Sequence, residues 1–353
     1  MTFLKVDNIF KSYDTKSIAV VDHISFEVKK NEIISIIGPS GTGKSTIVKI
    51  IAGLLEFEKG EVTFLDKRLV STQEKNTDLL KKISYVPQEL SLDSTLSVFQ
   101  NIGKNLDEEN EEKRHHRIRD MIEVFGLQYK DEKFPHELST GQKGRVEMAK
   151  ALVTQPRLLI LDEPFANLDK VLRNELKEEL VEILRERSIS ALIVTHDLED
   201  AFSHSDKILV LNEGRVKQFS TARDIYLKPV DAWVAKFSGS VNLMAGKIID
   251  KTDEHFIHEN KLGIFPILNV ESGLRVGDFA YMLIRPENVH IDQQSPLRGK
   301  IKRLTHLGAF HEAWLQVGGI EKFRMIVANS EVSSLKKSIS FTVDASQSSL
   351  IKI

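Results

Sequence analysis

The most constraining stretch of the chain covers residues 38 to 46, which read Gly-Pro-Ser-Gly-Thr-Gly-Lys-Ser-Thr. It satisfies every position of the phosphate-binding pattern G-x-x-x-x-G-K-[ST]. An apolar run at 33–37 precedes it as a buried strand, and apolar residues at helical spacing follow it up to Gly53. This strand–loop–helix order predicts an α/β fold in which backbone N–H groups and a helix N-terminus face phosphate oxygens.

The loop therefore predicts binding of a nucleoside triphosphate. Lys44 is placed to reach the β and γ phosphates, and the Ser45 hydroxyl to ligate Mg²⁺. A chance glycine-rich turn before a helix is the alternative interpretation. The predicted nucleotide-binding residues of the loop are Gly38, Pro39, Ser40, Gly41, Thr42, Gly43, Lys44, Ser45 and Thr46.

A second motif, which ends in two acidic residues, lies at 157–163 and reads R-L-L-I-L-D-E. Four apolar residues predict a buried strand that ends at Asp162 and Glu163, and ligands of open α/β sheets bind at that edge. We expect Asp162 to belong to the Mg²⁺ shell and Glu163 to polarise the attacking water as general base.

Composition indicates a globular protein and restricts the possible partners. The chain has 353 residues, which suggests two domains, and a formal net charge of −2, so no overall field favours nucleic acid. It has no cysteine, which excludes disulfides and thiolate metal sites. The N-terminus lacks the pattern of a signal peptide and no long apolar run is present, so we expect any membrane association to depend on a partner.

The pattern of elements divides the chain near residue 236. Residues 1–236 alternate short apolar strands with helical patterns and predict an α/β domain, with a mostly helical part at about 89–155. One long helix is predicted at 171–187 and another at 144–153. Residues 237–353 instead show short alternating strands, at 245–249, 279–284, 300–304, 313–317, 323–327 and 339–343. These predict a small, OB-like β-barrel domain.

Residues 138–142 read L-S-T-G-Q and lie between the phosphate loop and Asp162. With the other motifs, this stretch resembles the L-S-G-G-Q signature of the ATPase subunits of ABC transporters. The resemblance implies ATP as the nucleotide and a signature that faces the γ-phosphate held by a second subunit. Thr140 departs from the family's first glycine. The signature residues are Ser139, Thr140, Gly141 and Gln142.

The resemblance extends to single positions elsewhere in the α/β domain. Tyr13 matches the aromatic residue that stacks on adenine, and Gln88 the glutamine that senses Mg²⁺ near the membrane-subunit contact. Residues 166–169, Ala-Asn-Leu-Asp, resemble the loop that crosses the dimer interface, with Asp169 as its acidic member. His196 matches the histidine that contacts the γ-phosphate, where we expect it to orient and stabilise charge.

The C-terminal stretch 282–291, M-L-I-R-P-E-N-V-H-I, is similar to the accessory barrel of importer ATPases for oxyanions, ferric iron, polyamines or sugars. The resemblance implies a homodimer on the cytoplasmic side of the membrane, with two integral permease subunits and an extracytoplasmic solute-binding protein. The solute itself leaves no mark in this sequence.

The alternative is a non-transport ABC ATPase that acts on ribosomes or DNA. Ribosome-acting relatives usually carry two ATPase halves in one chain, whereas this chain has one phosphate loop. DNA-repair relatives insert a long coiled coil, and no sustained heptad repeat occurs here.

Overall fold

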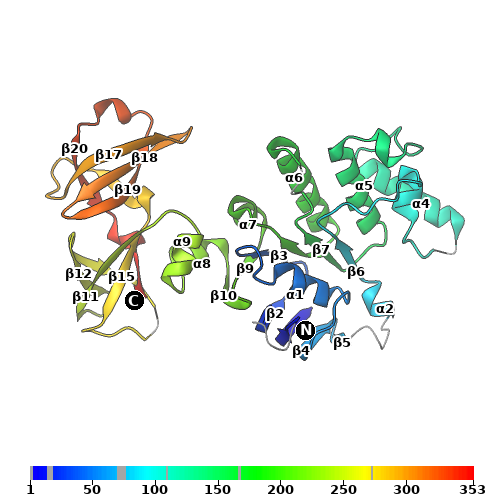
Figure 1. The fold of residues 1–353 in the computed structure, drawn as a ribbon, viewed down its shortest axis with the longest axis horizontal. Coiled ribbons are helices and arrows are strands. Elements are labelled where there is room, and N and C mark those ends of the chain that lie inside the picture. Colours follow the sequence, from blue (N-terminus) through cyan, green and yellow to red (C-terminus); the bar gives the residue numbers. More distant parts are fainter. Residues whose placement is uncertain (1–2, 14–18, 70–76, 109, 166–167, 272) are drawn as a thin grey trace. The chain divides into compact units, whose positions relative to one another are not determined.

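The chain forms two compact units, Met1–Ala222 and Arg223–Ile353, in a computed structural model (Figure 1). The structure describes residues 3–13, 19–69, 77–108, 110–165, 168–271 and 273–353. The division lies earlier than the boundary predicted at 236. The short helix α9 (Ala232–Phe237) and most of α8 (Ala222–Leu227) therefore pack with the C-terminal unit.

Two sheets form the framework of the first unit. The antiparallel sheet has the order β2-β1-β4-β5. Its strands are β1 (Leu4–Lys11), β2 (Val21–Val28), β4 (Lys59–Phe64) and β5 (Lys67–Leu69). The larger sheet has the order β10-β9-β3-β8-β7-β6, parallel except at the β10–β9 pair. Its strands are β3 (Ile33–Ile37), β6 (Ile83–Val86), β7 (Leu158–Asp162), β8 (Ser190–Val194), β9 (Lys207–Asn212) and β10 (Arg215–Ser220).

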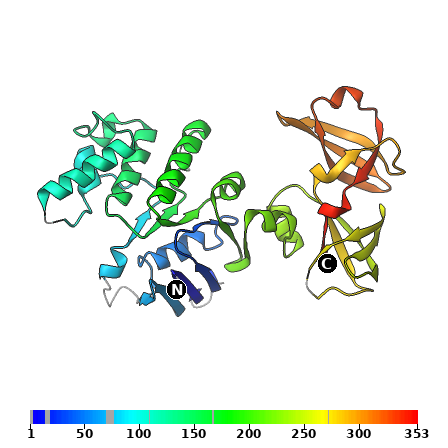
Figure 2. The same cartoon turned by 180° about the vertical axis from the view of Figure 1, so that it is seen from behind.

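Helices of the first unit cover the larger sheet and extend beyond its β6 edge. Figures 1 and 2 show α4 and α5 on that side, with β10 at the opposite edge. The helices are α1 (Lys44–Ile51), α2 (Thr77–Leu80), α3 (Val98–Gly103), α4 (Glu111–Val124), α5 (Thr140–Leu152), α6 (Lys170–Glu186) and α7 (Leu198–His204), with a 3₁₀ turn at Pro135–Glu137. Helices α3 to α5 fall within the part predicted to be helical.

The parallel strands are apolar along their whole length because both faces of the sheet are covered. In β7, Leu158 and Ile160 belong to the core shared with α1 and the antiparallel sheet. Leu159 and Leu161 belong to a second core shared with α3, α4, α5 and α6. Successive strand residues point to opposite faces, so two cores require a continuous apolar run. The polar Asp162 thus marks the strand end, where both cores stop.

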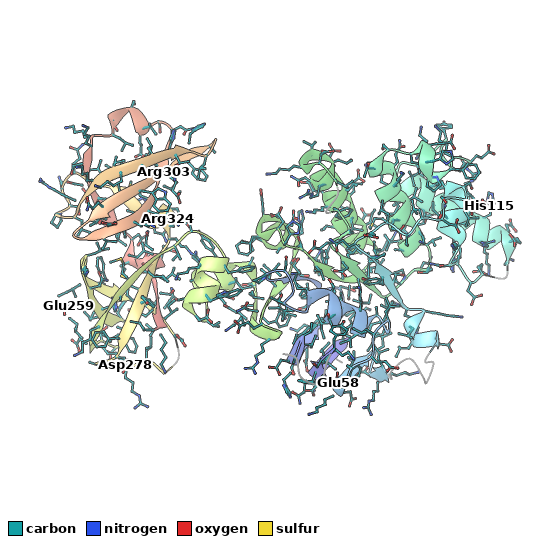
Figure 3. The ribbon with its side chains drawn as sticks, viewed as in Figure 1. Glu58, His115, Glu259, Asp278, Arg303 and Arg324 are labelled. Atoms are coloured by element: carbon teal, nitrogen blue, oxygen red, sulfur yellow. The ribbon has the colours of Figure 1, made fainter. Side chains whose placement is uncertain are left out.

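The second unit contains the predicted C-terminal β domain, built as two sheets around one core. The first has the order β13-β12-β11-β15-β21-β14 and the second β16-β20-β17-β18-β19, with antiparallel neighbours except for β14–β21. Side chains from both sheets fill the space between them (Figure 3). The first sheet comprises β11 (Asn242–Lys251), β12 (Phe256–Asn260), β13 (Gly263–Ile267), β14 (Asn269–Val270), β15 (Phe279–Ile284) and β21 (Ser349–Lys352). The second comprises β16 (Val289–Ile291), β17 (Arg298–His306), β18 (Phe310–Val317), β19 (Ile320–Ala328) and β20 (Ser338–Val343). Three 3₁₀ turns lie at Pro286–Asn288, Val332–Ser334 and Ala345–Gln347.

The arginine of the I-R-P-E stretch, Arg285, is fully buried in this second unit. Its guanidinium donates to the carbonyl oxygens of Tyr226 and Ala235 at 2.6 and 3.0 Å and lies 3.8 Å from the Tyr226 ring centroid. These carbonyl oxygens satisfy the buried N–H donors. Burial lowers the pKa of Arg285, and the negative charge of Glu287 acts in the opposite direction. Arg285 thus binds the α8–α9 segment to the β domain.

Candidate nucleotide-binding and hydrolysis site

The phosphate loop connects β3 to α1 and has the tight backbone that its glycines predict. Gly43 caps α1 with φ +90°, and a Cβ there would lie 2.3 Å from the Val20 carbonyl oxygen. A Cβ on Gly38 would lie 2.2 Å from the Leu211 carbonyl oxygen. Both positions require glycine because no side chain fits.

Lys44 lies inside this loop, only 7% exposed. Its Nζ donates to the carbonyl oxygens of Gly38 and Pro39, both at 2.9 Å. Burial lowers the pKa of Lys44, while the negative charges of Glu163 and Asp162 act in the opposite direction. The ammonium is thus held at the loop by neutral acceptors that a phosphate can replace.

Asp162, only 3% exposed, joins the phosphate loop to β6. The Ser45 hydroxyl donates to Asp162 Oδ1 at 2.9 Å, and the Tyr85 hydroxyl donates to Oδ2 at 3.0 Å. Burial raises the pKa of Tyr85, and the charge of Asp162 adds to the effect. Tyr85 was missed by the sequence prediction; its position on β6, the strand paired with β7, was the available signal.

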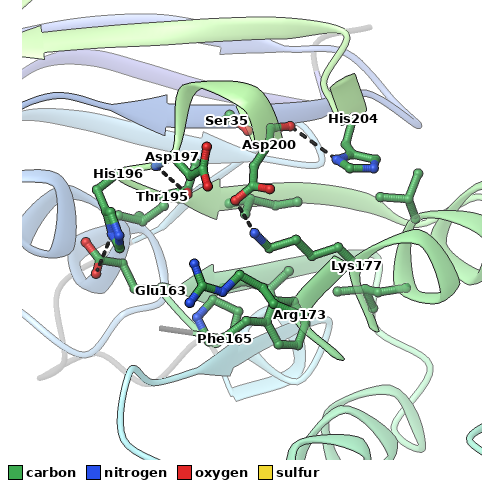
Figure 4. A pocket seen from close by; sticks show the side chains of 16 residues that line it. Ser35, Glu163, Phe165, Arg173, Lys177, Thr195, His196, Asp197, Asp200 and His204 are labelled. Carbon is green, nitrogen blue, oxygen red and sulfur yellow. Dashed lines mark hydrogen bonds and ion pairs between the residues drawn. The ribbon is translucent and has the colours of Figure 1, made fainter. Parts of the chain in front are cut away.

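Glu163 and His196 come together at the ends of β7 and β8. Glu163 has φ +50°, and its N–H donates to the Val194 carbonyl oxygen at 3.1 Å. Its Oε2 lies 3.3 Å from His196 Nδ1 (Figure 4). The Glu163 side chain is 21% exposed and that of His196 62%. A left-handed backbone in a non-glycine residue is uncommon, and here it turns the carboxylate toward the histidine.

A small cavity opens beside this pair, between α6 and α7 (Figure 4). Its volume is about 40 Å³, and the ion pair of Lys177 on α6 with Asp200 on α7 lines it. A drug-sized ligand needs roughly 300–1,000 Å³, so this cavity cannot enclose a nucleotide. The phosphate loop instead presents Pro39, Ser40 and Gly41 at the surface.

The signature residues begin α5, which starts at Thr140, earlier than the predicted 144. Ser139 caps the helix: its Oγ accepts from the Gln142 N–H at 3.3 Å, and Gln142 Oε1 accepts from the Ser139 N–H at 3.1 Å. Ser139 and Thr140 are exposed. Gly141 is buried, and a Cβ there would lie 2.5 Å from Leu172 Cδ2 on α6. Among the described residues, no hydrogen bond or ion pair joins the signature to the phosphate loop.

The remaining predicted residues lie at the surface of the first unit. Tyr13 is 64% exposed, with Lys11 Nζ 5.8 Å from its ring centroid. Gln88 is exposed on the bend after β6. Asp169 is the N-cap of α6 and accepts from the Leu172 N–H at 3.1 Å. Ala166 and Asn167 of the predicted interface loop lie outside the described residues.

The family model described as ABC transporter matches residues 21–166, which include the phosphate loop, the signature and Asp162. A spermidine/putrescine import ATP-binding protein PotA of Borreliella afzelii is 32% identical over 340 residues, 95% of this chain and 94% of that protein. The chain belongs to the ATP-binding subunits of ABC transporters. PotA of Vibrio cholerae is 31% identical over 306 residues, covering 86% of this chain and 80% of that protein.

Further comparisons concern the C-terminal unit and the fold of this ABC ATPase. A TOBE domain model matches residues 282–342 in the C-terminal unit. The structure of cbiO1 from Clostridium perfringens, part of an ABC transporter complex, aligns with a TM-score of 0.59 and 30% identity over 64% of this chain and 90% of that chain. A dimeric ATP-binding cassette with ADP and Pi bound aligns with a TM-score of 0.55 and 27% identity, over 62% of this chain and 98% of that chain. The predicted ABC ATPase with a C-terminal accessory domain is confirmed.

Proposed function

We propose that this ABC ATPase energises the import of polyamines of the spermidine and putrescine class. The observation that carries the proposal is similarity to a spermidine/putrescine import protein over 95% of the chain, through both units. The sequence left oxyanions, ferric iron, polyamines and sugars open as solutes, and the similarity favours the polyamines among them.

ATP is the proposed nucleotide, with its phosphates on residues 38–46 and its adenine on Tyr13. Lys44 Nζ exchanges the Gly38 and Pro39 carbonyl oxygens for β and γ phosphate oxygens, a stronger, charge-assisted contact. Glu163 accepts a proton from the attacking water, and His196 holds the Glu163 carboxylate and stabilises charge near the γ-phosphate.

The residues around Asp162 fit a bound Mg²⁺. The ion prefers oxygen ligands, and Ser45 Oγ lies 2.9 Å from Asp162 Oδ1 at the edge of the phosphate loop. Ser45 would hold the ion together with Gln88, and Asp162 would belong to its shell. Bound there, Mg²⁺ would neutralise charge on the phosphate oxygens. Tyr85 keeps the Asp162 carboxylate in its present orientation.

A homodimer is the proposed active form. The phosphate loop lies at the surface, and Ser139 and Thr140 of the signature are exposed on a different element. A second copy of the chain supplies Ser139, Thr140, Gly141 and Gln142 to each ATP, and Asp169 lies at the interface. ATP then closes the dimer, and loss of the γ-phosphate contacts opens it.

Two integral permease subunits and an extracytoplasmic solute-binding protein are the proposed partners, with this subunit peripheral on the cytoplasmic side of the membrane. None of the helices within the described residues is long and apolar enough to cross a bilayer. We propose that the segment after Gln88 contacts the permease. No nucleic-acid partner is proposed, since the formal net charge is −2.

Uptake of radiolabelled spermidine and putrescine tests the proposal. A strain that lacks the chain should lose uptake, the wild-type gene should restore it, and a Lys44→Ala variant should not. Purification from native membranes should recover a permease with the protein. Unchanged uptake in the deletion strain would exclude polyamine import, and recovery with ribosomes or DNA would favour the non-transport ABC ATPase.

A further inference from the structure

The small cavity between α6 and α7 extends from the proposed hydrolysis site to the other end of α7. Glu163 and His196 line one end of the cavity, and His204, the last residue of α7, also lines it. Figure 4 shows the ion pair of Lys177 and Asp200 between Glu163 and His204. The cavity therefore connects the proposed general base with a histidine that the hydrolysis mechanism does not use.

The walls of this cavity carry hydrogen-bonding groups that can bind water. Arg173 lines it, and the buried Nε atom of this residue has no hydrogen-bond partner within the described parts of the chain. A buried donor of this kind is usually satisfied by ordered water. The Lys177 ammonium has three donors and the Asp200 carboxylate about four acceptor sites. The two side chains of this ion pair can therefore bind water as well as each other.

The size of the cavity matches a short row of water molecules. Its volume is about 40 Å³, and one water requires roughly 10–15 Å³ of such space, so about three waters fit. Three waters in a row make four hydrogen bonds of roughly 2.8 Å, which together span about 11 Å. Helix α7 has seven residues and borders the cavity, and a helix of that length measures about 10 Å. A row of water can therefore reach from Glu163 to His204.

His204 is arranged to take up a proton. Its Nδ1 lies 3.2 Å from the Asp200 carbonyl oxygen, which can only accept a hydrogen bond, so Nδ1 carries the proton of the neutral ring. The other ring nitrogen, Nε2, then has a lone pair that can bind a proton. The side chain is partly exposed, so it also reaches solvent. An imidazole gains and loses a proton under physiological conditions, which makes histidine a common proton shuttle.

Hydrolysis in the proposed closed dimer produces a proton at a site covered by the second subunit. Water adds to the γ-phosphorus, the bond from that phosphorus to the bridging oxygen breaks, and ADP leaves with the electron pair. Glu163 takes one proton from the attacking water and must lose it before the next turnover. None of the described residues that line the cavity belongs to the phosphate loop. The cavity thus offers this proton a path that does not pass the nucleotide.

We propose that the cavity holds a row of water molecules that carries the hydrolysis proton from Glu163 to His204 and then to solvent. One proton moves at each transfer, and Glu163 returns to its ionised form. Arg173, Lys177 and Asp200 are positioning residues, because they orient the water and touch no reacting atom. The inference rests on the role proposed above for Glu163 and on the proposed closed dimer.

Single-turnover hydrolysis by the purified full-length protein tests the route. Rapid quenching measures cleavage of ATP, a pH indicator in weak buffer measures proton release, and a fluorescent phosphate-binding protein measures free phosphate. In the wild type, the proton should appear with cleavage and before the phosphate. In His204→Gln, the amide can still donate to the Asp200 carbonyl oxygen but cannot carry a proton. We therefore expect this variant to lose the early proton, which should appear together with phosphate when the dimer opens.

A second variant and a matched control accompany this measurement. Val181 lines the cavity, so the larger side chain of Val181→Phe should displace water from it and delay the proton in the same way. The control is His116→Gln, because His116 is exposed on α4 and does not line the cavity. In that control the proton should still appear before the phosphate. Thermal unfolding checks that each variant is folded.

The outcomes separate this inference from the proposed function. Simultaneous appearance of proton and phosphate in the wild type overturns the route. An early proton in His204→Gln, or in a folded Val181→Phe, overturns it as well, because a merely structural cavity would change the rate of cleavage and leave the order of release unchanged. Cleavage that survives Glu163→Gln contradicts the proposed general base instead, and the route then has no source of protons.

Discussion

The ion pair between Lys177 and Asp200 gives a stability prediction with an internal control. Their side chains are 14% and 13% exposed, and the contact joins α6 to α7. Lys177→Met removes the cation and leaves the Asp200 carboxylate buried without its partner. Breaking a buried pair in this way costs about 3–5 kcal/mol.

The cost converts into a measurable shift. A first unit of this size changes its melting temperature by about 2–4 °C per kcal/mol. We therefore expect a decrease of about 6–20 °C in the melting temperature. The urea midpoint should fall by about 1–1.7 M for a slope near 3 kcal/mol per molar.

Two spectroscopic signals report the two units separately. Helices α1 to α7 lie in the first unit, so far-UV circular dichroism mainly follows its unfolding. Both tryptophans, Trp233 and Trp314, lie in the second unit and report it by fluorescence. Lys177→Met should shift the dichroism transition and leave the fluorescence transition in place.

A second ion pair between the same two helices is the matched control. Lys170 and Glu199 lie 3.8 Å apart with both side chains 77% exposed, so Lys170→Met should leave the transition unchanged. The double variant Lys177→Met with Asp200→Leu leaves no unpaired charge and should recover most of the stability lost in Lys177→Met. A shift as small as that of Lys170→Met would refute the argument that burial makes the Lys177–Asp200 pair costly to break.

Four further predictions concern hydrolysis and pH. Glu163→Gln should lower kcat by about 10²–10⁴-fold while ATP binding persists, and near-normal turnover would refute its role as general base. Ser139→Arg should block dimer closure and hydrolysis with little change in monomer nucleotide affinity, as sedimentation and equilibrium binding would show; surviving activity would contradict the shared site. Tyr85→Phe removes a hydrogen bond to the Asp162 carboxylate and should lower kcat about tenfold in steady-state assays, and an unchanged kcat would show that this bond does not orient Asp162. Burial lowers the pKa of His258 in the second unit, so the unfolded chain binds the proton more readily and the free energy of unfolding should fall as pH drops below about 6.5. Unfolding followed by tryptophan fluorescence should show this pH dependence in the wild type and a weaker one in His258→Gln. An equal pH dependence in the two proteins would contradict the argument.

Local sequence patterns were sufficient to predict the structure where one short segment forms a complete loop or strand. The phosphate loop is continuous in sequence, and its glycines meet steric requirements set by the loop and its nearest neighbours. The run at 158–161 predicted a strand covered on both faces, and the structure confirms it as β7. The strands β4, β12 and β13 were missed because short, partly exposed strands carry a weak alternation that only their neighbours stabilise.

The sequence by itself determined the fold class, the family and the identity of most candidate residues, because each is encoded within a few consecutive positions. Only the tertiary structure decided which of them meet. Tyr85 reaches Asp162 across two paired strands, Lys177 reaches Asp200 between two helices, and Ser91 lies between Glu147 and Lys150. These contacts join residues 23 to 77 positions apart, except for the Glu147–Lys150 pair itself. Their partners depend on how strands and helices pack, which no local pattern specifies.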